Sequence, residues 1–249
     1  MRFDLKFVDF SNEIFEVQSA GGNALFQLIR GTNGATAGIG SRIYSSNGLG
    51  WDPWLRWVPE GTRVRGYFQS WRYFAAGGSR VITRDRVLPK EGVTDWFEDL
   101  RFRARRQRPI ALHFRRGDYR KLCDEFGLLE AKYYEDALAA LRERCVEGPI
   151  WVFSDEPKAA EETLSELDYD FQFVIPPGES HPGETLHLMA LSSAHVLSNS
   201  SFAWWGAALN SGKPLVFFPK PWFRGLKAPS KMWPPTWLPI NHSWEAVRG

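Results

Sequence analysis

Residues 109–218 alternate between short apolar runs and segments of helical periodicity, and this alternation constrains the fold more than any other feature. The apolar runs predict five strands, at 110–114, 150–153, 171–174, 194–197 and 214–218. Helices are predicted between them, at about 130–146, at 157–167, from 183 onward and at 201–210. Strands that alternate with helices pair in parallel through right-handed crossovers, so the pattern predicts a doubly wound α/β sheet.

The chain of 249 residues is long for one domain and allows two smaller ones. The regular alternation starts after residue 108, so we expect an N-terminal α/β domain over 1–108 and a second domain over 109–249. In the first, we expect a strand hairpin within 1–19 and a helix over 94–107 with Thr94 as its N-cap. A glycine pair at 21–22, expected to lie between a strand and a helix, would let backbone amides approach an anion.

Composition narrows the class of protein. Hydrophobic residues make up 43% of the chain, which is enough for a packed core, and the net charge of +2 creates no field that favours nucleic acid as a partner. The two cysteines lack metal-binding spacing and favour a reducing compartment. The start of the chain does not resemble a secretory signal, and no apolar run is long enough to cross a membrane, so we expect a cytoplasmic protein.

Five arginines fall within residues 101–108, at the end of the helix expected over 94–107. The simpler interpretation is the solvated, basic end of a helix. The functional interpretation is contact with an acidic lipid surface or an anionic acceptor. We favour the first and keep peripheral membrane contact as the alternative.

The stretch from Ile110 to Tyr119 is an apolar strand that ends in two arginines, a glycine and an aspartate. Adjacent side chains on a strand point to opposite faces, so Arg115 and Arg116 should not both face one ligand. We expect Arg115 to face a site and Arg116 to point toward structure, with Asp118 as a candidate partner. Guanidinium groups suit phosphate, and open α/β sheets bind ligands at the carboxyl ends of their strands. A surface cluster of ion pairs explains the same ten residues about equally well.

A second stretch, Leu197 to Asn210, favours the anion site. A buried strand ends here in four small polar residues, at 198–201, and a helix begins directly after them. The free N–H groups at a helix start attract anions, and serine and asparagine side chains add donors. Helix capping explains one of the serines but not four polar residues in a row. Together with Arg115, this segment would hold a diphosphate from two sides.

At these residues the chain resembles a known family. The segment 113–119, HFRRGDY, resembles the HxRRxD motif of α1,2-, α1,6- and protein O-fucosyltransferases, and it is most similar to the α1,2 group, glycosyltransferase family 11. The segment 199–207, NSSFAWWGA, resembles the NSSFSWWGA block of that family, and Phe153-Ser154-Asp155 resembles its FSDD segment. Segments 21–27, 66–74 and 219–223 resemble further motifs of the family, in the same order.

The resemblance implies a GT-B-like fold, in which two Rossmann-like halves face each other across a cleft. The N-terminal half would lie on the acceptor side, and the C-terminal half would bind the nucleotide sugar. The implied reaction is an inverting, metal-independent transfer of L-fucose from GDP-β-L-fucose to a glycan hydroxyl, as in a galactoside 2-α-L-fucosyltransferase. No cofactor is implied. Bacterial members of this type act on surface polysaccharides in the cytoplasm, often on lipid carriers, which implies an oligosaccharide or lipid-linked acceptor.

The resemblance also assigns roles to individual residues. Arg115 would bind the β-phosphate as the glycosidic bond breaks, because an enzyme without a metal must neutralise the leaving diphosphate with fixed cations and amide donors. Asp118 is the second catalytic candidate. By their location alone, Asp118 and Asp155 are candidates for a general base, although Arg116 and Asp118 are rather expected to brace the loop. Donor contacts are expected from His113, Arg115, Asn23, Asp155, Glu184, Asn199, Ser200, Ser201 and Phe202, with Glu184 at the guanine edge. No residues are expected to bind a metal.

The chain departs from the family pattern at several places, and the departures at Ala24 and Thr185 keep other functions open. Ala24 stands where the opening motif has glutamine, Glu156 replaces the second aspartate of FSDD, and Thr185 stands where an acid is common. One alternative is a glycosyltransferase that uses another nucleoside diphosphate sugar. The other is a non-catalytic protein that binds nucleotides or glycans.

Overall fold

A computed structural model describes the chain in segments, and the fold divides into two compact units. The described residues are 3–7, 15–18, 24–27, 29–30, 43–45, 50–59, 63–66, 70–72, 84–89, 92–229 and 231–246. One unit comprises 1–87 with 229–234, and the other comprises 88–228 with 235–249. The helix at 95–107 therefore belongs with the second unit, whereas the expected domain boundary at residue 108 assigned it to the first.

The first unit contains two small sheets among its described strands. Strand β1 (Phe3–Phe7) pairs in parallel with β3 (Ala24–Gln27). The other sheet has the order β4 (Ile29–Arg30), β2 (Phe15–Gln18), β6 (Arg63–Gly66) and β5 (Ile43–Ser45), and β2 is antiparallel to both of its neighbours. The unit also has two short 3-10 helices among its described residues, η1 (Pro53–Trp57) between β5 and β6, and η2 (Arg84–Val87) after β6.

Two predictions for this unit are wrong. Strands β1 and β2 do not form a hairpin, because they lie in different sheets. A strand, β3, begins two residues after the glycine pair, where a helix was expected. The apolar pattern predicted where strands form but not which strands pair, because pairing depends on contacts that are distant in sequence. The glycine pair itself lies outside the described residues.

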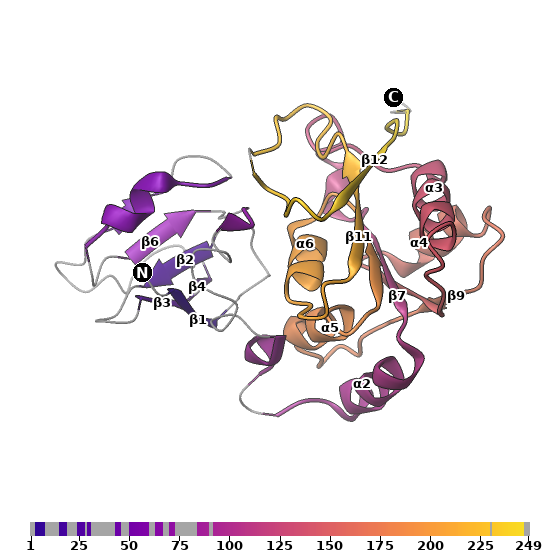
Figure 1. The fold of residues 1–249 in the computed structure, drawn as a ribbon, viewed down its shortest axis with the longest axis horizontal. Helices are drawn as coiled ribbons and strands as arrows, with labels where there is room; N and C mark the ends of the chain where they lie inside the picture. Colours follow the sequence, from indigo (N-terminus) through magenta and orange to yellow (C-terminus); the bar gives the residue numbers. More distant parts are fainter. Residues whose placement is uncertain are drawn as a thin grey trace. The chain divides into compact units, whose positions relative to one another are not determined.

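The second unit is built on a six-stranded parallel sheet (Figure 1). Its strands are β7 (Ile110–Phe114), β8 (Ile150–Ser154), β9 (Phe171–Phe173), β10 (Ala194–Val196), β11 (Leu215–Lys220) and β12 (Leu238–Asn241). The order across the sheet is β12-β11-β10-β7-β8-β9, which is the Rossmann order. The prediction of a parallel, doubly wound sheet is confirmed, and of its six strands only β12 was not predicted.

Helices cover both faces of this sheet (Figure 1). On one side lie α3 (Ala131–Arg142) and α4 (Pro157–Leu164), and on the other lie α5 (Pro182–Met189) and α6 (Ser201–Ala208). Helix α2 (Asp95–Gln107) begins at its predicted cap, where the Thr94 side chain accepts a hydrogen bond from the N–H of Phe97, and it packs against α5. None of the described helices combines the length and the apolar composition needed to cross a bilayer.

Strand β7 lies at the centre of the sheet, and all five of its residues are buried. Below one face, the apolar side chains of Leu112, Phe114 and Val196 pack against Tyr133, Tyr134, Ala137, Leu138 and Leu141 of α3. A strand buried on both faces needs a continuous apolar sequence, which is why residues 110–114 lack the polar alternation of an exposed strand. The core therefore holds β7 rigidly up to the point where its charged loop begins.

His195 on β10 is fully buried. Its Nε2 lies 3.2 Å from the side-chain nitrogen of Asn210. Burial lowers the pKa of the imidazole to about 3. His195 is therefore neutral in the folded protein at neutral pH.

We predict that acidification destabilises the protein through this histidine. Between pH 6.5 and 3 the unfolded chain protonates His195 and the folded chain does not, so the free energy of unfolding falls as the pH falls. The contribution between pH 7 and 5 is about 2 kcal/mol. Urea unfolding of the parent protein and of His195→Gln at both pH values checks this. An equal loss of stability on acidification in both proteins would contradict it.

Candidate active site

Strands β7 and β10 are neighbours in space, although about 80 residues separate them in sequence. From β7 the chain moves outward to β8 and β9, then crosses back to β10 and moves the other way to β11 and β12. The direction of the sheet thus reverses between β7 and β10. In open α/β folds, ligands bind outside the carboxyl ends of the strands at this reversal. Both stretches singled out in the sequence lie there.

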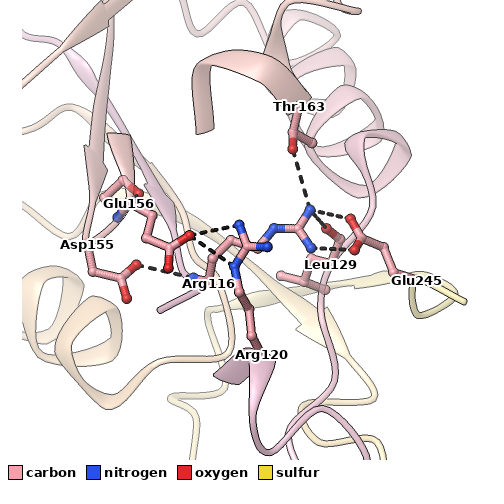
Figure 2. A network of polar contacts seen from close by, with 8 residues as sticks. Arg116, Arg120, Leu129, Asp155, Glu156, Thr163 and Glu245 are labelled. Carbon is pink, nitrogen blue, oxygen red and sulfur yellow. Dashed lines mark hydrogen bonds and ion pairs between the residues drawn. The ribbon is translucent and has the colours of Figure 1, made fainter. Parts of the chain in front are cut away.

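The two arginines after β7 have different surroundings, as the alternation of side chains predicted. Arg116 is 6% exposed, and its guanidinium forms a bidentate ion pair with Glu245 (Figure 2). It also donates to the carbonyl of Leu129 and to the hydroxyl of Thr163, both at 3.4 Å. Its carbon atom Cζ lies 5.1 Å from the centre of the Phe114 ring. These contacts confirm that Arg116 points toward structure.

Arg115 points away from this cluster and is partly exposed, with a side-chain exposure of 25%. It donates to Asp118 at 2.6 Å and lies 3.3 Å from Asp155, and its guanidinium rests over the ring of Tyr119. Asp118 was expected as a partner of Arg116, and this prediction is wrong, because Asp118, the first residue of η3 (Asp118–Arg120), pairs with Arg115 instead. Burial lowers the pKa of the Arg115 guanidinium, but the charges of Asp155 and Asp118 raise it by more, so it remains a fixed cation.

His113 on β7 contacts the four small polar residues 198–201, which we call the serine block. Its Nδ1 lies 2.7 Å from the Oγ of Ser198, and its ring lies beside Phe202, with centroids 6.0 Å apart. Burial, together with the positive charge on Arg115, lowers the pKa of His113 to about 3. The imidazole is therefore neutral at neutral pH and acts by hydrogen bonding rather than by charge.

The serine block connects to the same loop through its backbone. The carbonyl of Asn199 accepts a hydrogen bond from Tyr119 at 3.0 Å, and the side-chain amide of Asn199 donates to the carbonyl of Phe126 at 2.7 Å. Ser200 is the N-cap of α6, and its side chain makes no capping hydrogen bond. Ser201 is the first residue of the helix. The start of α6 thus offers backbone donors and the Ser200 hydroxyl at the carboxyl end of β10.

Glu184 has a different environment from the other predicted donor residues. It is fully buried, and its carboxylate accepts hydrogen bonds from the backbone N–H of Thr94, at 2.6 Å, and from the hydroxyl of Ser180. It also completes a capping box with His181 at the start of α5. These bonds join the N-termini of α2 and α5, so the structure gives Glu184 a supporting position. A contact with guanine would have to replace some of them.

One predicted residue has no described position, and one residue of the site was not predicted. Asn23 lies outside the described residues. Glu245, the partner of Arg116, was not anticipated, because it is 129 residues away in sequence and belongs to no motif. The only signal for it was the expectation that Arg116 points toward structure, since a buried guanidinium requires a carboxylate. Among the described residues, no group of three or more His, Cys, Asp or Glu side chains could hold a metal ion.

Comparison with known proteins gives one family match. The family model described as Glycosyl transferase family 11 matches residues 55–237. This range contains the β7 loop, the serine block and Asp155, and it leaves out Asn23 and Glu245.

Two curated relatives come from Escherichia coli. The protein named Alpha-1,2-colitosyltransferase is 32% identical over 167 residues, which are 64% of this chain and 55% of the relative. The O-antigen biosynthesis glycosyltransferase WbnK is 33% identical over 133 residues, which are 51% of this chain and 43% of the relative. The chain spans about half the length of the curated relatives it matches.

We predict that Glu245→Gln lowers the free energy of unfolding by about 2 kcal/mol, because it leaves the buried Arg116 without a counter-charge. The value is below that for a fully buried pair because Glu245 is one-third exposed. Urea unfolding at pH 7 measures the change. Glu143→Gln removes a highly exposed carboxylate and is the control, with an expected change within about 0.5 kcal/mol. Equal effects of the two substitutions would contradict the prediction.

Proposed function

The chain belongs to glycosyl transferase family 11, and from this premise we propose that it transfers a sugar from a nucleoside diphosphate donor to a hydroxyl group of a glycan. The observation that supports this most is that Arg115 and the start of α6 follow neighbouring strands, β7 and β10, at the carboxyl ends where the sheet reverses direction. A fixed cation and a set of helix N–H donors are the groups that a leaving diphosphate requires.

In the proposed reaction, the bond between the sugar and the β-phosphate oxygen breaks, and its electron pair stays on the phosphate. The acceptor hydroxyl attacks the sugar from the opposite face and loses its proton, which inverts the configuration. Arg115 would stabilise the negative charge that develops on the diphosphate. The Ser200 hydroxyl and the amides of Ser201 and Phe202 would bind the remaining oxygens. His113 and Asn199 would hold the serine block in place.

We propose L-fucose, delivered by GDP-β-L-fucose without a metal ion, as the transferred sugar, and an α1,2 linkage to galactose. The likeness of segments 113–119 and 199–207 to the fucosyltransferase motifs supports the donor. A second candidate is the nucleotide-activated form of colitose, which the name of one relative favours. Asn23 and Glu184 are retained as proposed donor contacts, and Asp118 as a second catalytic group.

The proposed acceptor is a cell-surface polysaccharide under assembly in the cytoplasm, free or on a lipid carrier. The name of the second relative, which refers to O-antigen biosynthesis, supports this class of acceptor. The exposed arginines near the end of α2 support a weak peripheral contact with an anionic membrane, because each cation close to such a surface contributes about 1 kcal/mol.

We predict that Arg115→Ala abolishes transfer while the fold is retained. Loss of one group that stabilises the transition-state charge costs about a hundredfold to a thousandfold in rate, and the loss of a full cation should lie at the upper end. The measurement is transfer of fucose from GDP-fucose to galactosides, with circular dichroism to verify folding. Arg142→Ala removes an exposed arginine at the end of α3 and should leave the rate unchanged. Near-normal turnover by Arg115→Ala would disprove the role of Arg115.

We predict that GDP, but not UDP or ADP, stabilises the protein against heat. A ligand at a hundred times its dissociation constant adds about 2.7 kcal/mol, which raises Tm by about 5 to 10 °C. A thermal-shift screen followed by transfer assays with GDP-fucose and with activated colitose separates the candidates. Stabilisation by UDP or ADP alone would favour a different nucleotide sugar. Binding of GDP without transfer or hydrolysis of any GDP-sugar would favour a non-catalytic binding protein.

A further inference from the structure

Asp155 contacts three consecutive residues of the loop that follows β7. Its Oδ1 accepts a hydrogen bond from the backbone N–H of Arg116 at 3.1 Å (Figure 2), and its Oδ2 lies 3.3 Å from a terminal nitrogen of Arg115. A Cβ atom added to Gly117 would lie only 2.1 Å from the same Oδ2. One carboxylate therefore controls the backbone of this loop, the direction of the Arg115 side chain and the space beside Gly117.

The register of the sheet explains why Asp155 reaches all three residues. Strands β7 and β8 are parallel neighbours, and Phe114 pairs with Ser154 at their carboxyl ends. Asp155 is therefore the first residue beyond the ladder on one strand, just as Arg115 is on the other. Pro157 starts α4 two residues later, so the backbone that carries Asp155 is held between a strand and a helix. The carboxylate is thus presented from a rigid support.

A carboxylate is an unsuitable direct ligand for a diphosphate, because like charges repel. Asp155 nevertheless lies beside the cation assigned to that diphosphate. Both of its oxygens are engaged by groups of the loop, which is the arrangement expected of a residue that fixes a neighbour in position. Such support matters for catalysis, because a displacement of about 1 Å can lower a rate a hundredfold.

We propose that Asp155 is a positioning residue, which orients Arg115 and its loop for the donor diphosphate and acts on the reaction only through Arg115. This inference rests on the proposed function and replaces the roles of nucleotide ligand and general base for Asp155. A general base or a nucleotide ligand contributes whether or not Arg115 is present. A positioning residue contributes only while Arg115 is there to be positioned.

A double-mutant cycle distinguishes these roles. The four proteins are the parent, Asp155→Asn, Arg115→Ala and the double variant, each assayed for kcat/KM with GDP-fucose and for GDP affinity by calorimetry. Asp155→Asn should lower kcat/KM about tenfold to a hundredfold, because an amide nitrogen would face either Arg115 or the N–H of Arg116. In the Arg115→Ala background the same substitution should weaken GDP binding no further. Losses that multiply in the double variant, or a single variant with parental activity, would overturn the proposal.

Gly117→Ala provides an independent test that removes no charged group. The added methyl group must displace the Asp155 carboxylate, so kcat/KM should fall to about the level of Asp155→Asn. Combining the two substitutions should cost no more than the larger single effect. This variant also keeps the proposal testable if Asp155→Asn folds poorly. Parental activity in Gly117→Ala would overturn the proposal.

Controls separate this inference from the function on which it rests. Asp170→Asn removes an exposed carboxylate just before β9 and should leave kcat/KM and GDP affinity at parental values. If the parent protein neither binds GDP nor transfers from any GDP-sugar, the proposed function fails and the inference fails with it. If the parent is active and the effects at Asp155 and Arg115 are independent, the inference alone fails.

Discussion

The guanidinium of Arg116 is buried at the carboxyl end of the central strand, and the arrangement of the site depends on how its charge is compensated. Burial of an unpaired cation costs several kcal/mol, so this side chain needs a carboxylate with good geometry. Glu245 provides it, and Thr163, Leu129 and the Phe114 ring complete the surroundings. With Arg116 fixed on one face of the strand, the alternation of side chains directs Arg115 to the other face. A structural ion pair thereby sets the direction of the arginine that we assign to the chemistry.

The same logic extends to the segments around the site. Neutral His113 holds Ser198, Tyr119 holds the carbonyl of Asn199, and these bonds tie the end of β10 to the end of β7. Each of these hydrogen bonds adds little to the free energy of unfolding, because water bonds to the same groups in the unfolded chain. An unpaired polar group at these buried positions would nevertheless be costly. These polar contacts within the protein therefore hold the segments of the site in place. Preorganisation of this kind is what electrostatic stabilisation of a leaving group requires.

The features that the sequence predicted are those with local causes. Apolar runs, caps and the alternation of strands with helices correctly placed five strands of the second unit, its helices and the opposite directions of Arg115 and Arg116. Features with distant causes were missed or wrong: the sixth strand β12, the pairing of β1 and β2, and the Glu245 partner of Arg116. Glu184 illustrates the intermediate case. Glu184 was predicted as a site residue, but its contacts with the cap of α2, some 90 residues earlier, cannot be predicted from a motif.

The position of Glu245 has a consequence for where the functional unit ends. The family match stops at residue 237, before β12 and before this carboxylate. A fragment cut at that point would keep every recognisable motif and would lose both an edge strand and the counter-charge of Arg116. The boundary set by shared sequence and the boundary set by electrostatic neutrality are therefore different. In this fold the pairing of Arg116 with Glu245 decides how much of the chain is needed to keep the loop after β7 in its conformation.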